Sequence, residues 1–324
     1  MLGAILAVLS AASFAATNAA GRRGVITGTP AQGMVLSNPI GMLCFLVVAV
    51  LTAQIIGIGE FPATATAWMA AVGVLHFVFG RYANFRANQS AGANLTAPLI
   101  QLNVVVTLTL AVLVLGEPCT VLQIIGGMIM LSGAFITQQQ TTGSAPAATP
   151  KFSPRHAEGY LFALLAALAY GISPIMSRTA LQSSGPSSAI WGGLIAYGAA
   201  TAAVAIMLLL SPSLRRNVMS LHRDNVRWFV YSGVAVALAQ GFLYAAVSVA
   251  PIMVVIPLLQ LSLVFRLFLS MWLNPEHEVF GARVIIGSAI SMMGACAVAV
   301  DSDLILSALG APDALAQLLR VQAR

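Results

Sequence analysis

The segment PLIQL at 98–102 recurs as PLLQL at 257–261, 159 residues further along the chain. With a two-residue shift after this segment, the same repeat pairs Glu117 with Glu278, Gly126 with Gly287 and Gly133 with Gly294. Upstream, at a spacing of 156 residues, Arg22 falls opposite Arg178. The chain therefore contains two related halves.

The composition of both halves indicates a lipid environment. Of the residues, 59% are hydrophobic and only 7% are charged, and the mean hydropathy is +0.92. Nearly every apolar block exceeds the ~18 residues that cross a bilayer as a helix. These values indicate an all-α integral membrane protein, and a duplicated apolar unit of this size is typical of transporters.

Ten transmembrane helices are predicted, five in each half. They are expected at 2–20, 35–57, 63–84, 89–115, 118–137, 158–179, 188–210, 227–247, 250–273 and 280–300. Because five crossings are an odd number, the second copy is expected upside down relative to the first, as two inverted five-helix repeats.

The predicted units are a first repeat at 1–137, a flexible linker at 138–157, a second repeat at 158–300 and a polar, amphipathic tail at 301–324. The linker is rich in Gln, Thr, Ala and Pro, a composition typical of flexible segments. A cleaved signal peptide is the alternative for the first block, but no basic residue precedes it and it matches 159–180.

The positive charge lies in loops rather than on one basic face. The net charge is +6, yet eleven of the fifteen basic residues follow odd-numbered spans, including Arg22, Arg81 and Arg86. Three lie on the other side, and Arg266 lies inside a span. The positive-inside rule then predicts cytoplasmic odd loops and outward-facing termini, and no nucleic-acid partner.

Motifs of enzymes are missing from the sequence. None of the three cysteines has the spacing of a disulfide or a metal ligand, and there is no phosphate-binding loop or nucleophile set. We expect no enzymatic activity, no metal and no cofactor.

Several stretches resemble a known family. The segment LVLGEPCTVLQIIGGMIMLSGA at 113–134 is similar to the most typical segment of the drug/metabolite transporter superfamily, in particular its EamA-type members. The segments YANFRA at 82–87 and FLYAAV at 242–247 also resemble family positions. The resemblance implies a solute carrier, often an exporter of metabolites, with a cavity between the halves. It also implies cytoplasmic termini, which conflicts with the charge bias.

Polar residues inside the spans are the candidate solute ligands. Gln101 and Asn103 follow Pro98, and Gln260 follows Pro257. Proline interrupts a helix and exposes carbonyl groups, so matched breaks in both halves indicate a site at mid-membrane. Hydrogen bonding between helices is the alternative role of these amides.

Charged and aromatic residues are the remaining candidates. Arg266 and Arg81 are candidates to bind an anionic solute, with snorkelling or interface anchoring as the alternatives. His76 is the candidate for a coupling proton, and Trp68 and Tyr244 are candidates to line the cavity.

All nine acidic residues fall in predicted loops, turns or the tail. We therefore expect no buried carboxylate and a neutral to positive cavity, which favours an anionic or zwitterionic solute.

The sequence thus predicts a secondary transporter that exports a small metabolite by alternating access across the inner (plasma) membrane. The glycines at 126, 133, 287 and 294 are expected to let helices pack closely, either within the chain or in a homodimer. The other expected partners are the metabolite and membrane lipid. A non-transporting scaffold or sensor and a lipid-handling membrane protein are the alternatives.

Overall fold

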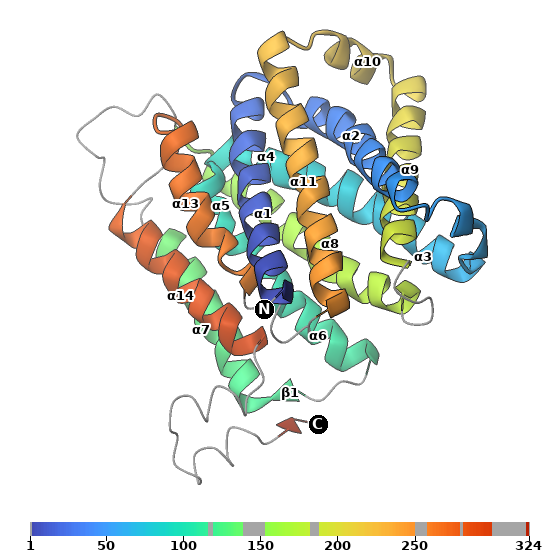
Figure 1. Cartoon of the computed structure of the whole chain (residues 1–324). Helices are drawn as coiled ribbons and strands as arrows, with labels where there is room; N and C mark the ends of the chain where they lie inside the picture. Colours follow the sequence, from blue (N-terminus) through green and yellow to red (C-terminus); the bar gives the residue numbers. More distant parts are fainter. Residues whose placement is uncertain are drawn as a thin grey trace.

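The computed structural model describes residues 2–115, 119–138, 153–181, 188–249, 258–278, 281–299 and 322–323, and almost all of them are helical (Figure 1). Most of the predicted linker and most of the predicted tail lie outside these ranges. The first half contains α1 (Leu2–Thr27), α2 (Pro30–Leu51), η1 (Ile56–Glu60), α3 (Ala63–Val72), η2 (Gly73–Gly80), α4 (Arg81–Ala91), α5 (Ala93–Ile100), α6 (Asn103–Leu115), β1 (Cys119–Thr120) and α7 (Val121–Gln138). The second half contains α8 (His156–Leu181), α9 (Ser188–Leu210), α10 (Pro212–Met219), α11 (Arg223–Val249), α13 (Ser262–Leu273), α14 (Ala282–Ala299) and β2 (Gln322–Ala323).

Seven helical segments are long and apolar enough to cross a membrane, and three shorter apolar helices lie in α7, α13 and α14. Large apolar side chains face outward along these helices. On α13, for example, Phe268 is 67% exposed and Trp272 is 78% exposed. Exposed apolar surface on this scale suits lipid rather than water, so the chain is a multi-pass membrane protein.

Helix boundaries differ from the predicted spans at two important places. α1 continues to Thr27 rather than ending at residue 20, and the third span continues through η2 and α4 to Ala91 rather than ending at residue 84. As a result Arg22 and Arg81 lie within helices and are buried. Their assignment to loops, or to the end of a span, was wrong.

Local sequence explains the sharp turn between the first two helices. Thr29 accepts a hydrogen bond from the backbone N–H of Gln32, whose side chain accepts one from the Thr29 N–H, and Pro30 occupies the first helical position. This capping box provides acceptors for backbone N–H groups that have no partner within the first turn of α2.

The junctions that follow alternate spans meet at one end of the molecule. The Gln32 side chain, at the α1–α2 turn, donates to the Asn217 carbonyl in α10. The Gln89 side chain near the end of α4 donates to the Gly28 carbonyl, and the Arg155 N–H donates to the Ser90 carbonyl. These contacts place the loops after the first, third, fifth and seventh spans together.

The long helices pack in matched pairs. α1 runs along α11 and α13, and α8 packs in the same way against α4 and α6 (Figure 1). α2 packs on α11 and on α9, while α9 packs on α3. α7 and α14 lie side by side.

Glycines make the α7–α14 contact close. A Cβ atom on Gly133 would lie 2.6 Å from the Gly287 carbonyl oxygen, and one on Gly294 would lie 2.6 Å from the Gly126 carbonyl oxygen. The predicted packing role of these glycines is confirmed, and the contact they make is within the chain.

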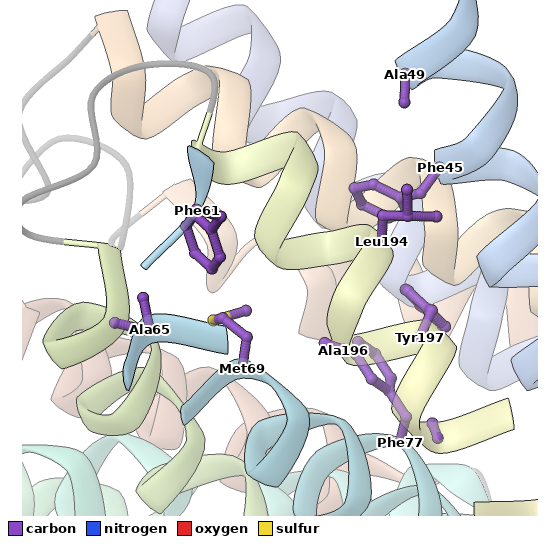
Figure 2. Packing of buried hydrophobic residues seen from close by; sticks show 11 residues of the cluster. Phe45, Ala49, Phe61, Ala65, Met69, Phe77, Leu194, Ala196 and Tyr197 are labelled. Carbon is purple, nitrogen blue, oxygen red and sulfur yellow. The ribbon is translucent and has the colours of Figure 1, made fainter. Parts of the chain in front are cut away.

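An aromatic cluster fills the space between α2, η2 and α9 (Figure 2). The rings of Phe77 and Tyr197 stack with centroids 3.9 Å apart, and Phe45 lies 5.5 Å from Tyr197. A Cβ atom on Gly41 would overlap the Tyr197 ring, so a side chain there would displace the ring. This packing fixes η2, which carries His76.

Candidate functional site

Both predicted helix interruptions are present, at equivalent positions of the repeat. α5 ends at Ile100 and α6 begins at Asn103, while α13 begins at Ser262 after a turn at 260–261. The backbone bonds match as well: the Leu102 N–H bonds to the Leu99 carbonyl, and the Leu261 N–H bonds to the Leu258 carbonyl. Pro98 lies inside α5, as predicted, whereas Pro257 lies outside the described residues.

The two interruptions meet each other. The Gln101 side-chain amide donates to the side-chain oxygen of Gln260, so equivalent residues of the two halves are in direct contact. Gln260 is 4% exposed and Gln101 is partly buried. Asn103 is also partly buried, and its backbone carbonyl accepts the Thr107 hydroxyl at 2.9 Å.

Arg266 lies one turn into α13 from the Gln260 interruption. It is 6% exposed, and its Nε and Nη1 atoms have no hydrogen-bond partner among the residues that the structure describes. Buried guanidinium groups are normally paired, because an unsatisfied charged donor carries a desolvation penalty of several kcal/mol. Two unsatisfied donor atoms on one buried cation therefore indicate a place where an anion could bind.

Arg81 is held by neutral groups. Its Nε donates to the Ser37 hydroxyl at 2.8 Å, and its Nη2 donates to the Ser232 hydroxyl at 3.1 Å and carbonyl at 3.2 Å. The guanidinium also lies over the Phe85 ring, 4.9 Å from its centroid. No carboxylate among the described residues forms an ion pair with Arg81, so its positive charge is not neutralised locally.

Tyr170, on α8, links the two arginines. Its phenol interacts electrostatically with both Arg81 and Arg266, and it receives a 3.4 Å hydrogen bond from the Asn84 amide. Sequence reasoning missed Tyr170 because its segment, LAYGIS at 168–173, offers no pattern beyond an apolar helix with a single tyrosine.

His76 belongs to the π-helical segment η2 and lies beside Tyr170 of α8. The two ring centroids are 4.5 Å apart, and the His76 Nε2 lies 3.5 Å from the Gln240 amide nitrogen. π-helical turns are rare and often occur at functional sites. The segment places His76 in the same polar region as the two arginines.

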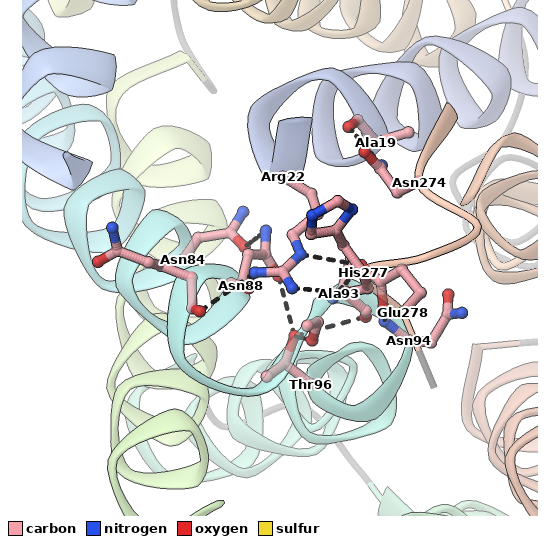
Figure 3. A network of polar contacts seen from close by, with 12 residues as sticks. Ala19, Arg22, Asn84, Asn88, Ala93, Asn94, Thr96, Asn274, His277 and Glu278 are labelled. Carbon is pink, nitrogen blue, oxygen red and sulfur yellow. Dashed lines mark hydrogen bonds and ion pairs between the residues drawn. The ribbon is translucent and has the colours of Figure 1, made fainter. Parts of the chain in front are cut away.

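A ladder of amides connects this region to the junction of α4 and α5. Asn84 donates to Asn18 at 3.1 Å, Asn88 donates to Asn84 at 3.0 Å, and the Thr96 hydroxyl donates to Asn88 at 2.9 Å (Figure 3). All four side chains are buried. They had no place among the predicted site residues, because N-x₃-N in a helix is also common on solvated faces.

The expectation that no carboxylate is buried was wrong. Glu278, in the loop after α13, has a fully buried side chain and pairs with Arg22 of α1, with 3.4 Å between Oε1 and Nε. The arginine also donates to the carbonyls of Asn88, Gln89 and His277. The pair joins the two halves across more than 250 residues of sequence (Figure 3).

The first turn of α5 supplies the remaining partners of Glu278. The Ala93 N–H donates to Oε1 at 2.7 Å and the Asn94 N–H donates to Oε2 at 2.9 Å. A carboxylate is favourable there because helix N-termini carry unsatisfied N–H groups and a partial positive charge. Burial raises the pKa of the Glu278 carboxyl, while Arg22 and the two amides oppose that effect.

The other predicted site residues are less central. Trp68 is 44% exposed on α3, so the structure leaves its lining role untested. The Tyr244 side chain lies outside the described residues. Arg86, within α4, pairs with Glu158.

Among the described residues, no group of three metal-binding side chains lies close enough to hold an ion. A cavity of about 370 Å³ lies at the end of α13, lined by Arg23, Trp272, Leu273, Pro275, Glu276 and His277. Arg266 and Gln260 do not line it.

Comparisons with known proteins concern the family and the fold. Residues 1–138 match the model of the EamA-like transporter family, which belongs to the drug/metabolite transporter superfamily. A crystal structure of a protein aligns with 94% of this chain and 98% of its own length, at 16% identity and a TM-score of 0.55. That likeness concerns the fold alone. No curated protein matches the chain significantly.

Proposed function

We propose that this chain, whose residues 1–138 match the EamA-like transporter family, is a secondary transporter with ten spans that exports a small anionic or zwitterionic metabolite. The two halves would expose a site near Gln101 and Gln260 to one side of the membrane at a time. The membrane would be the inner, or plasma, membrane.

The packing of the helices supports ten spans in two inverted repeats. Seven long apolar helices and three shorter ones are present among the described residues. Exchanging the halves turns the contacts of α1 with α11 and α13 into those of α8 with α4 and α6. The reciprocal contacts Gly133–Gly287 and Gly294–Gly126 are also what a twofold relation produces. The loops after the first, third and seventh spans meet at one end of the molecule, which supports successive helices crossing the membrane in opposite directions.

The observation that carries the solute class is Arg266. It is a buried cation with two unsatisfied nitrogen atoms, and it lies beside the interruption of its span. Tyr170 places a second cation, Arg81, in the same region. The one fully buried carboxylate among the described residues, Glu278, is already held by Arg22 and two amides. The centre is therefore positive, and an anionic group on the solute would neutralise it.

Alternating access fits the burial of the proposed site. Arg266 is 6% exposed and Gln260 is 4% exposed, so a solute would reach them through a rearrangement of the halves. The interruptions at 101–102 and 260–261 give both halves a place to bend.

Transport into proteoliposomes tests the proposal. Purified protein would be offered pooled radiolabelled amino acids, organic acids and sugar phosphates, and wild type would be compared with Arg266→Gln. Because a charged hydrogen bond contributes about 1.5–3 kcal/mol, we expect the variant to lose at least about tenfold in transport of the anionic pool. The matched control is Arg216→Gln, which removes the same charge from the exposed face of α10 and should leave transport unchanged.

Two results would count against the proposal. Equal transport by wild type and Arg266→Gln would remove Arg266 from the solute site and leave the carrier in place. Failure of wild type to transport any pool, in either direction and with or without a pH gradient, would favour a membrane scaffold or sensor.

A further inference from the structure

Glu278 is unusual among the acidic residues that the structure describes. Its side chain is fully buried, whereas that of Glu158 is 24% exposed and those of Glu60, Asp224 and Glu276 lie at the surface. It belongs to the second half, but every polar group that holds its carboxylate belongs to the first. Loss of its charge would therefore act on the contact between the halves.

Protonation would break the contact with α5 in particular. Both carboxylate oxygens accept an N–H group, one from Ala93 and one from Asn94. A protonated carboxyl has no negative charge, and its hydroxyl oxygen is a much weaker acceptor than a carboxylate oxygen, so one of the two amides would lose most of its hydrogen bond. The backbone at Gly92 packs directly against this carboxylate: its φ is +87°, and a Cβ atom there would lie 2.8 Å from Oε2.

Arg22 would keep its place when Glu278 is neutral. Its guanidinium also donates to the carbonyls of Asn88, Gln89 and His277, and these acceptors do not depend on the carboxylate. A proton on Glu278 would therefore release the start of α5 without leaving Arg22 unpaired. α5 leads directly to the interruption at Gln101.

Glu278 is also linked by charge to the solute region. It interacts electrostatically with Arg266 from α13 as well as with Arg22 from α1. Among the described residues around the pair, the remaining titratable neighbour is His277 in its own loop, while α4 and α5 contribute backbone and amide groups. An anion that neutralises Arg266 would remove an attraction that keeps Glu278 charged, and so would favour its protonation. By linkage, a proton on Glu278 would strengthen anion binding to the same extent.

We infer that Glu278 is the proton-binding site of this carrier, and that its protonation accompanies anion binding and frees α5 from the loop after α13. The inference rests on the proposed function. A proton taken from the water on one side would be released to the water on the other, together with the solute. For a monoanion this co-transport is electroneutral, so the solute gradient and the pH gradient together set the direction, and export follows an outward solute gradient.

Two assays in proteoliposomes separate the inference from the proposed function. Counterflow of a radiolabelled anion at equal pH reports solute exchange, and a pH dye inside the vesicles reports solute-driven proton movement. Glu278→Gln carries a permanent side-chain amide donor that resembles the protonated acid. We expect this variant to retain counterflow within about threefold of wild type and to lose at least about 90% of the proton movement. Glu158→Gln, which removes a partly exposed carboxylate, should behave as wild type in both assays.

Each outcome has one meaning. Absence of counterflow by wild type would overturn the proposed function. Counterflow with full proton movement by Glu278→Gln would overturn the inference alone. The inference alone would also be overturned if His76→Gln, rather than Glu278→Gln, abolished proton movement.

A second measurement needs no solute and checks that the variant is folded. Hydrogen exchange of peptides that contain the Ala93 and Asn94 amides, corrected for intrinsic rates, would be followed in the full-length protein in detergent. Between about pH 8 and about pH 5 we expect at least a tenfold loss of protection in wild type. In Glu278→Gln protection should be low throughout, with other helices protected as in wild type. Equal, pH-independent protection in both proteins would contradict the release of α5.

Discussion

Gly92 is the residue on which the junction between α4 and α5 depends. Its backbone has a φ of +87°, a region that side chains with a Cβ atom rarely adopt, and the Glu278 carboxylate occupies the space where a Cβ would lie. The turn therefore needs glycine for two independent reasons. A side chain here would both strain the backbone and push Glu278 away from the α5 amides.

We predict that Gly92→Ala lowers the free energy of unfolding by about 1–3 kcal/mol. The measurement is the thermal unfolding midpoint in detergent. Gly198→Ala is the control, because Gly198 lies inside α9 with nothing within 4 Å of its Cβ position; it should leave the midpoint unchanged or raise it, since Ala favours helix. Equal midpoints for wild type and Gly92→Ala would show that the junction tolerates a side chain.

Some residues of the site could be predicted from the sequence, and others could not because their partners are distant along the chain. Gln101, Gln260 and Arg266 could be proposed from the repeat and from their place inside apolar spans. The Arg22–Glu278 pair could not, because no local pattern connects residues so distant, and each alone resembles an ordinary loop charge. The recurrence of an Arg and a Glu in both halves is the one signal of the pair that the sequence offers.

At the scale of elements, small residues decide how closely helices approach. α7 and α14 meet through glycines whose Cβ positions fall on the backbone of the opposite helix, Gly133 on Gly287 and Gly294 on Gly126. Contact through the backbone holds two short apolar helices together in a solvent that offers no hydrophobic driving force between them.

We predict that Gly294→Ala destabilises the protein by about 1–3 kcal/mol, because its Cβ would lie 2.5 Å from the Met130 backbone nitrogen and the helices would have to separate. The control is Gly127→Ala on α7, whose Cβ would meet only Val105 at an ordinary 3.9 Å. Chemical denaturation in mixed micelles distinguishes the two. If both variants unfold at the same denaturant concentration as wild type, the close approach of α7 and α14 at Gly294 does not contribute to stability.

The prolines predicted the interruptions of the elements better than hydropathy predicted their ends. The breaks beside Gln101 and Gln260 were expected from Pro98 and Pro257. The extensions of α1 to Thr27 and of the third span to Ala91 were not, because their last turns contain Asn, Arg and Gln, which bond to one another and to backbone carbonyls inside the protein. The π-helical segment at Gly73–Gly80 was not predicted, because its sequence, GVLHFVFG, is an ordinary apolar stretch.

For the whole molecule, the meeting of alternate junctions at one end gives the positive charges a common side. Burial of Arg22 and Arg81 removes two residues from the charge count, but the exposed arginines of α10 and the partly exposed Arg155 remain on that side. The charge bias therefore still predicts a cytoplasmic location for this end and external termini.

We predict that a cysteine at Ser213, in a variant whose native cysteines are replaced by serine, reacts with a membrane-impermeant maleimide only in inside-out vesicles. Ser213 lies on the exposed face of α10, beside Arg215 and Arg216. Labelling in right-side-out vesicles instead would place the termini in the cytoplasm, as the family resemblance implies. A cysteine at exposed Ala63, at the opposite end of its span, should show the reverse pattern.

The Arg22–Glu278 pair also constrains how the protein is made. The ribosome delivers Arg22 with the first span but reaches Glu278 only 256 residues later, about 13–50 seconds at ordinary elongation rates. During that interval an arginine destined for burial has no carboxylate, and the start of α5 has no cap. The first half must therefore wait in an unfinished state, close to the insertion machinery or to lipid headgroups, until the loop after α13 is synthesised. Biogenesis of this protein ends with a long-range closure rather than with the independent folding of two halves.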